Sequence, residues 1–311
     1  MSDTPQSAVY SDLGRLNAWR FHVKHFKLGH QQRIMMQANG SRPSPRKGRG
    51  MEFSEVRVYQ PGDDVRHIDW KVSARSQDTH TKLFSEEHER PVVFVVEQSA
   101  RLFFASQHCF KSVLALDILA ILAWASLNQD DRVGGLVFGD QPAHWITPKR
   151  QAKNLLQLFH HGLHQNQALN QPAPGDNQAW LRALNHIAPL VHPASRVILI
   201  GDCLNIDKNA HAVLSQIAKH GAVTAIHCED PIESDLPDSY ALAFSDGETE
   251  VYLDGQNANL RQNYQKAYDQ AWLNQKNSFS RLGVALCRVS TADAMGNGLI
   301  NSLVKQRILR R

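Results

Sequence analysis

The chain has 311 residues, of which 42% are hydrophobic and 21% charged, proportions that exclude a disordered or fibrous protein. The longest apolar run, residues 112–127, is interrupted by Asp117 and is too short to suggest a membrane span. The net charge of +4 is uneven, because residues 1–50 carry nine basic and two acidic side chains, whereas the remainder carries 25 basic and 28 acidic ones. The basic character therefore belongs to an N-terminal extension, residues 1–45.

The first residues lack the apolar core of a secretory signal. The four cysteines of the whole chain form no CxxC pair. Both features favour a cytoplasmic protein with free thiols, and peripheral contact with the inner membrane face is the alternative. Residues 11–28 have the apolar spacing of an amphipathic helix. We expect this helix to pack on the main domain. The alternatives are a helix that contacts a membrane surface and a basic extension that lies on nucleic acid, although no dedicated nucleic-acid motif is present.

Residues 46–90 are predicted to form a small β-rich unit. Residues 52–59 alternate as a strand does, Asp64 can cap a short helical turn, and residues 81–84 resemble a second strand. The stretch from Arg46 to Arg75 within this unit is the part of the chain densest in alternating charge. Its arginines and carboxylates form either a structural clamp or a surface that binds a partner.

From residue 91 onward, strands and helices alternate, which predicts a parallel sheet with helices on both faces. Residues 91–230 form the core of this domain, and residues 231–311 complete it. The predicted strands are 92–96, 132–138, 144–147, 196–200, 223–227, 240–244, 251–253 and 284–289. The predicted helices are 109–127, 149–164, 178–190, 208–220, 257–281 and 293–308.

Two of the apolar strands end in polar residues, Glu97-Gln98-Ser99 after the first and Gly201-Asp202 after the second. Ligands bind at such strand ends in open parallel sheets. The order of elements resembles a von Willebrand factor type A domain, a Rossmann-like fold in which a DxSxS sequence, a Thr and an Asp bind a divalent cation.

That resemblance implies a Mg²⁺ site made by Glu97, Ser99, Thr147 and Asp202, since Mg²⁺ prefers oxygen ligands. The last hydroxyl of the motif is replaced by Arg101, however, whose fixed positive charge opposes a cation. We therefore expect a degenerate site without a cofactor, with Mg²⁺ as the less favoured alternative.

The sequence GRGMEFSEVRVYQPGDDVRHIDWKVSAR resembles the signature of the bacterial domain-of-unknown-function family numbered fifty-eight. Members carry this signature just before a von Willebrand type A-like domain. The residues considered as a clamp or partner surface are Arg49, Glu52, Arg57, Tyr59, Asp63, Asp64, Arg66, Asp69, Trp70 and Arg75.

The resemblance implies that the partner is a MoxR-type AAA+ ATPase and that the protein is a non-enzymatic adaptor in chaperone-like assembly. Neither a phosphate-binding GxxxxGK[ST] sequence nor a nucleophile-elbow GxSxG sequence is present, so we expect no catalytic residues. The alternative is a metal-dependent hydrolase that uses the degenerate site at Glu97 and Asp202.

Overall fold

A computed structural model describes residues 8–29, 51–60, 63–76, 78–86, 91–245, 247 and 249–311. The chain divides into two compact units. Residues 37–89 form the smaller one, here called the signature unit. Residues 1–36 and 90–311 form the larger one, here called the main unit.

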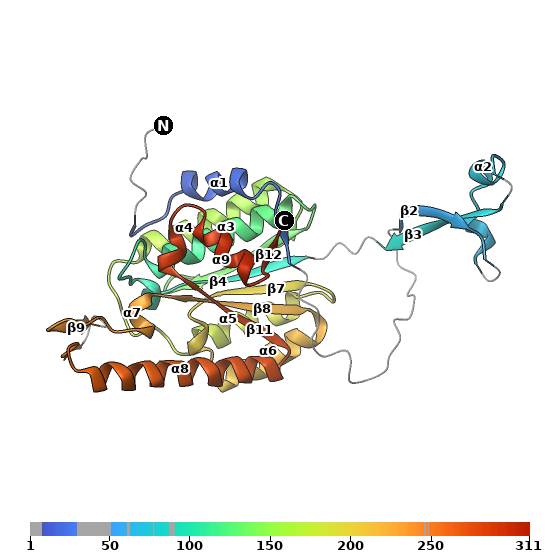
Figure 1. The fold of residues 1–311 in the computed structure, drawn as a ribbon. Coiled ribbons are helices and arrows are strands. Elements are labelled where there is room, and N and C mark those ends of the chain that lie inside the picture. Colours follow the sequence, from blue (N-terminus) through green and yellow to red (C-terminus); the bar gives the residue numbers. More distant parts are fainter. Residues whose placement is uncertain are drawn as a thin grey trace. The chain divides into compact units, whose positions relative to one another are not determined.

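The main unit is built on a six-stranded sheet with the order β11-β8-β7-β4-β5-β6 (Figure 1). Five strands are parallel, and β6 alone is antiparallel to its neighbour β5. The connection between β5 and β6 is too short for a crossover, so it can only turn back as a hairpin. The strands are β4 (Val92–Gln98), β5 (Val133–Gly139), β6 (His144–Lys149), β7 (Arg196–Gly201), β8 (Ala222–Glu229) and β11 (Val284–Ser290).

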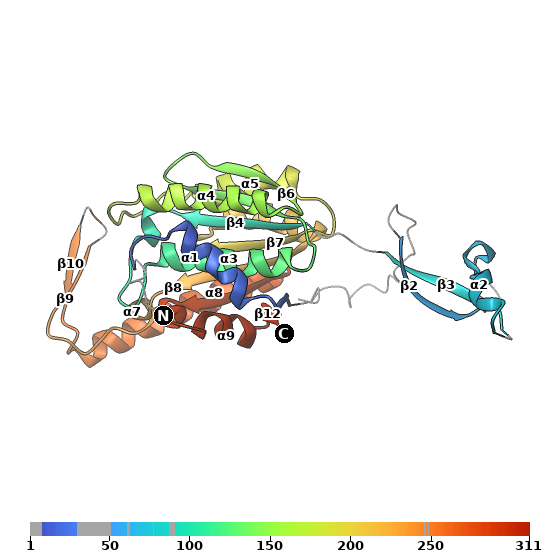
Figure 2. The ribbon, with the colours of Figure 1, turned by 90° about the horizontal axis from the view of Figure 1, so that it is seen from above.

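Helices cover both faces of this sheet (Figures 1 and 2). One face carries α1 (Leu13–His22), α3 (Lys111–Leu127), α4 (Ala152–Ala168) and α9 (Gly298–Lys305). The other face carries α5 (Ala179–Ile187), α6 (Lys208–His220) and α8 (Ala258–Arg281). Side chains of β4 alternate between the two apolar cores, with Phe94 on the α3 side and Val95 on the α5 side. The mixed α/β fold with a mostly parallel sheet was therefore predicted correctly.

The helix α1 packs on α3 through a buried ion pair. The guanidinium Nε of Arg15 donates to the carboxylate of Asp117 over 2.9 Å, and the indole of Trp19 donates to the same carboxylate over 2.9 Å. Leu16, Trp19 and Val23 are buried in the core beneath. The apolar face of this helix is thus occupied by the main unit, which favours the packed-helix interpretation. Among the described residues, no helix is long and apolar enough to cross a membrane.

Two predicted helices are shorter than expected because short strands and turns replace their ends. The first helix ends at His22, and β1 (Lys27–Leu28) pairs with β12 (Leu309–Arg310). The predicted helix 293–308 is interrupted near Gly296, which has φ of 54°, and is preceded by the 3-10 helix η5 (Thr291–Ala294). The remaining short elements of the main unit are η2 (Ala100–Leu102), η3 (Ala188–Leu190), η4 (Cys203–Asn205), α7 (Pro231–Ser234), β9 (Leu242–Ser245) and β10 (Glu250–Leu253).

The signature unit contains an antiparallel hairpin, as the sequence predicts. Strand β2 (Met51–Val58) pairs with β3 (His80–Glu86), and a 3-10 helix, η1 (Val65–His67), and a helical turn, α2 (Trp70–Ser73), lie between them in the chain. An isolated bridge from Ile68 to Thr81 ties this connection to β3.

Candidate functional site

The two strands that end in polar residues are neighbours in the sheet. Val96 of β4 pairs with Ile200 of β7, so the residues that follow, Glu97 and Gly201, lie side by side at the same end of the two strands. The strand order reverses between β4 and β7, and this is where open α/β sheets bind ligands. The structure therefore brings Glu97, Ser99 and Asp202 together, as expected.

The carboxyl group of Glu97 is buried and engaged on both oxygens. Oε1 accepts a hydrogen bond from the Ser99 hydroxyl over 2.7 Å, and Oε2 accepts one from the backbone N–H of Asp202 over 2.8 Å. Gly201 permits this approach, because a Cβ atom at its position would lie 2.5 Å from the Cβ of Glu97. The three residues form a closed cluster within the chain.

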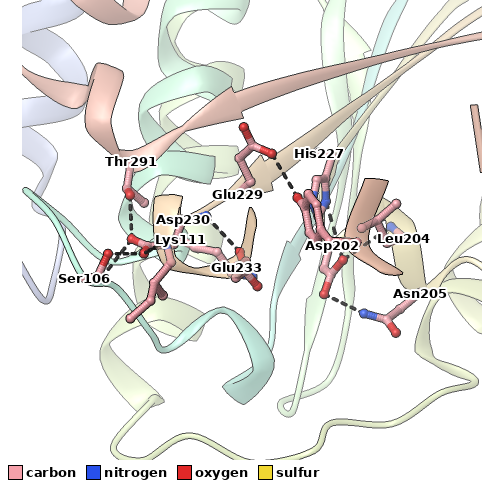
Figure 3. A network of polar contacts seen from close by, with 12 residues as sticks. Ser106, Lys111, Asp202, Leu204, Asn205, His227, Glu229, Asp230, Glu233 and Thr291 are labelled. Carbon is pink, nitrogen blue, oxygen red and sulfur yellow. Dashed lines mark hydrogen bonds and ion pairs between the residues drawn. The ribbon is translucent and has the colours of Figure 1, made fainter. Parts of the chain in front are cut away.

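Asp202 is also buried and is held by its own neighbours (Figure 3). Its side chain accepts from the amide Nδ2 of Asn205 over 2.5 Å and from the backbone N–H of Leu204 over 3.3 Å. The imidazole Nδ1 of His227, on the adjacent strand β8, lies 3.4 Å from the Oδ1 atom of Asp202. The carboxylate therefore stabilises the turn after β7.

The surroundings of the site shift the pKa values of Glu97 and Asp202 in opposite directions. Burial, reinforced by the negative charge of Asp202, raises the pKa of Glu97 to about 7. Burial also acts to raise the pKa of Asp202, but the positive charges of Lys111, His227 and Arg101 hold that pKa below its ordinary value. Asp202 is therefore ionised at neutral pH, while a substantial fraction of Glu97 is protonated.

Lys111 supplies a buried positive charge at this edge. It is the first residue of α3, and its ammonium Nζ lies 2.7 Å from the Oε1 atom of Glu233. Burial opposes its charged form, but Glu233 and Asp202 together raise the pKa of Lys111 above its ordinary value. The ammonium group is therefore charged and compensated, as a buried ion requires.

A further carboxylate at the same edge, that of Asp230, accepts hydrogen bonds from two other segments of the chain and caps α7. It accepts hydrogen bonds from the Ser106 backbone over 2.8 Å and from the Thr291 hydroxyl over 2.6 Å, and the Ser106 hydroxyl also donates to it. It caps α7 in a reciprocal arrangement with Glu233. His227 and Asp230 lie at or just after the end of the apolar strand β8, so the strand-end rule could have found them. Lys111 begins a helix, and no sequence signal places it at this edge of the sheet.

Arg101 is hydrogen-bonded to the segment before α5 and not to Glu97 or Asp202. Its Nη2 atom donates to the carbonyl of Pro174 over 2.5 Å and to the Oδ1 atom of Asn177 over 2.9 Å. Thr147 lies at the other end of the sheet, where its carbonyl accepts from the Asn154 amide over 3.1 Å, close to the start of β5. Thr147 therefore does not join Glu97 and Asp202.

The donors of this site do not fit a divalent cation. Both oxygens of Glu97 already accept hydrogen bonds, and its raised pKa disfavours the charged form that binds Mg²⁺. The hydroxyl of Ser99 donates to Glu97, and Asp202 faces His227 and Lys111. In the part of the chain that the structure describes, no three His, Cys, Asp or Glu side chains gather where they could hold a metal ion.

In the signature unit, the acidic residues stabilise local structure. The Nη2 atom of Arg57 lies 2.7 Å from the Oδ1 atom of Asp63, Asp64 caps η1, and Asp69 caps α2 through hydrogen bonds from two backbone N–H groups. Tyr59 is half-buried. Glu52 lies on β2 opposite Ser85, and Arg49 is outside the described residues.

Other signature residues face solvent. The indole of Trp70 is 71% exposed and Val65 is 61% exposed, although both are large apolar side chains. Arg66 and Arg75 are exposed as well. The signature thus divides into carboxylates that cap short helices and exposed apolar and basic side chains nearby in sequence.

Comparison with known proteins places the chain among proteins without an assigned activity. Uncharacterized proteins of Mycobacterium tuberculosis and Mycobacterium bovis are each 31% identical over 204 residues, which is 66% of this chain. The match spans 63% of the length of these relatives.

Solved structures with a similar arrangement include an aerotolerance-related membrane protein from Bacteroides fragilis with multiple mutations to serines. That structure is 15% identical with a TM-score of 0.42, and the match covers 70% of this chain and 98% of the other. The conserved hypothetical protein BatB from Bacteroides thetaiotaomicron is 14% identical with a TM-score of 0.40, and the match covers 70% and 97%.

A family model described as "Protein of unknown function DUF58" matches residues 55–272, more than half of the chain. This match includes most of the signature and five of the six strands of the sheet, while β11 lies beyond it. The family predicted from the signature is therefore confirmed, and the chain belongs to the DUF58 family.

Proposed function

We propose that this protein is a non-enzymatic interaction module that works with a MoxR-type AAA+ ATPase, and that its main unit is von Willebrand type A-like. The strand order, with its reversal between β4 and β7 and its antiparallel edge strand β6, supports the proposed fold relationship. The ATPase partner is proposed from the signature at residues 48–75.

The exposed indole of Trp70 is the observation that carries this proposal. Trp and Arg side chains dominate the binding energy of protein interfaces, and a tryptophan that is 71% exposed gains little from folding alone. Val65, Arg66 and Arg75 add exposed apolar and basic groups to the same stretch of chain. We therefore assign the partner contact to these four residues, and the structural role to Asp63, Asp64 and Asp69.

The hydrolase alternative is not proposed, because the strand-end carboxylates are committed to the protein itself. Glu97 accepts from Ser99 and from the backbone of Asp202, and Asp202 holds Asn205 and faces His227. A general base must reach a reacting proton directly or through one water, and the side chains of Glu97 and Asp202 are both buried. We therefore propose that Glu97 and Asp202 stabilise the loops that follow β4 and β7 and take no part in catalysis.

The proposal predicts that Trp70→Ala weakens binding to the MoxR-type ATPase by at least about tenfold without changing the stability of the protein. Phe21→Ala is the matched control, because this ring is 81% exposed on α1 of the main unit. Binding would be measured by surface plasmon resonance with the ATPase in its ATP-, ADP- and nucleotide-free states.

Asp69→Ala separates a structural effect from a binding effect. Loss of the α2 cap should destabilise the signature unit by about 1 kcal/mol, measured by hydrogen exchange of the α2 amides. If wild type fails to bind the ATPase in every nucleotide state, or if Trp70→Ala binds as tightly as Phe21→Ala, the proposal is wrong.

A further inference from the structure

We propose that the β9–β10 hairpin of the main unit is a docking arm for a segment of a partner protein that carries apolar side chains beside Lys and Arg. This inference goes beyond the proposed function, because it concerns a different unit of the chain and does not depend on an ATPase. The arm comprises Leu242–Ser245 and Glu250–Leu253. Figure 2 shows it projecting from the body of the main unit, near the start of α8.

The arm has one apolar face. Val251 pairs with Phe244 and Leu253 pairs with Leu242, and residues directly opposite each other in an antiparallel pair share a face. Val251 is 52% exposed, and the other three side chains are only half-buried. The opposite face carries Ser245, Glu250, Ala243 and Tyr252. The hairpin is therefore amphipathic, but its apolar face remains partly open to water.

A ribbon of this kind is incomplete by itself. An isolated two-stranded hairpin is at best marginally stable in water, and it gains stability when a third strand or a helix covers its apolar face. Among the described residues, β9 and β10 pair only with each other. A partner segment that covers Val251 and its neighbours would supply the missing layer.

The negative charge of the residues in and around the arm favours a partner segment that carries positive charge. Residues 234–260 contain six acidic residues and no Lys or Arg. Arg261, just beyond this range, lies 3.4 Å from Asp238 and compensates one of the six. The resulting negative field repels nucleic acid and anionic lipid and attracts a basic segment.

Two exposed tyrosines lie on the arm and just before it in the chain. Tyr240, which precedes the arm, is 83% exposed and Tyr252 is 70% exposed, and the Tyr252 hydroxyl donates to the Oε2 atom of Glu250 over 2.8 Å. An aromatic ring beside a carboxylate can hold a Lys or Arg side chain through a cation–π contact and an ion pair. Tyr252 and Glu250 lie on the face opposite Val251, so this pair can hold a basic side chain that reaches past the edge of the hairpin, and the apolar contact belongs to the Val251 face alone.

The test uses the full chain and defined peptides of about 12 residues, which is enough for one strand or about three helical turns. One peptide alternates Lys with Val and Leu, and a second places the same residues at helical spacing. Their counterparts carry Glu in place of Lys. Fluorescence anisotropy should show that at least one basic peptide binds at least about tenfold tighter than its acidic counterpart, and less tightly as salt is added.

Val251→Lys should weaken this binding by at least about tenfold, because it removes an apolar contact and repels a basic peptide. Val65→Lys is the matched control, since it makes the same change at a valine 61% exposed in the signature unit. Val65→Lys should leave peptide binding unchanged and weaken ATPase binding, so failure of one proposal is distinguishable from failure of the other.

Three results would overturn the inference. Basic peptides that do not bind, acidic peptides that bind equally well, and peptide binding that survives Val251→Lys each contradict it. Sedimentation velocity of the free protein gives a further outcome. If the chain self-associates and Val251→Lys abolishes this, the arm binds a second copy of the chain, and the proposed partner is wrong.

Discussion

The carboxyl group of Glu97 is held on both oxygens near the end of β4. One oxygen accepts from Ser99 and the other accepts from the backbone N–H of Asp202. Both donors stabilise the carboxylate, yet burial and the charge of Asp202 outweigh them. The group is therefore poised to titrate near neutral pH.

Glu97→Gln should remove a pH-dependent part of the stability. The pKa of Glu97 is raised from 4.5 to about 7 on folding, so its contribution is fully present below pH 4.5 and is lost as the pH rises through 7. A glutamine can accept from Asp202 and donate to Ser99 without titrating. Relative to wild type, the variant should therefore gain on the order of 3 kcal/mol between pH 4.5 and 8.

Urea unfolding at a series of pH values measures this difference. Glu250→Gln is the control, since this carboxylate lies exposed on β10 and should leave the pH profile unchanged. A constant difference between wild type and Glu97→Gln across the pH range would show that folding does not shift the pKa of Glu97.

At the scale of elements, the contact between α1 and α3 depends on one buried ion pair. The side chain of Asp117 is fully buried, and that of Arg15 is 7% exposed. Asp117→Ala would leave the guanidinium buried without its partner, so it should destabilise the main unit by about 3–5 kcal/mol. Chemical unfolding monitored by Trp19 and Trp124 fluorescence, both at this contact, would measure the loss.

The double variant Arg15→Met/Asp117→Leu is the companion experiment. Because apolar residues of similar size often replace a buried ion pair without loss, it should recover part of the stability that Asp117→Ala removes. The rest of the loss belongs to the Trp19 indole N–H, whose acceptor is missing in both variants. If the double variant is as unstable as Asp117→Ala, the pair itself, and not the uncompensated charge, stabilises the contact.

Regular elements were predictable where the pattern of the chain was local. The apolar runs of β4, β7 and β8 and the periodicity of α6 and α8 placed these elements within a few residues of their observed limits. The pairing of β1 with β12 joins residues at opposite ends of the sequence, so no local pattern announces it. The short helix α7 has a recognisable Asp230-Pro231 start but is absent from the predicted helices.

The candidate site was predictable only in part. The strand-end rule identified Glu97 and Asp202, because the apolar runs located the ends of β4 and β7. The type A resemblance added Thr147, which the antiparallel direction of β6 carries to the opposite end of the sheet. Lys111 reaches the site from the first turn of α3, and only the three-dimensional packing of that helix reveals it.

For the whole molecule, the division into two units predicts that the main unit folds without the signature unit. Replacing residues 37–89 by a flexible Gly/Ser linker should leave a cooperatively folded protein, because both apolar cores belong to the main unit. Circular dichroism and thermal unfolding would test this. The shortened protein should retain binding of basic peptides but lose ATPase binding, and failure to fold would show that the units are interdependent.

Because α1 covers part of the buried helix α3, deleting the N-terminal residues should alter how strongly the protein binds lipid. Sixteen of its 17 residues are buried, and part of that cover is α1, with Leu16 and Trp19 lying against it. Removing residues 1–28 would therefore uncover a helix that is apolar on almost every side. Such a protein should bind lipid vesicles more strongly than the full chain, and the added affinity should be insensitive to salt. A deletion made to remove a membrane anchor would thus create one.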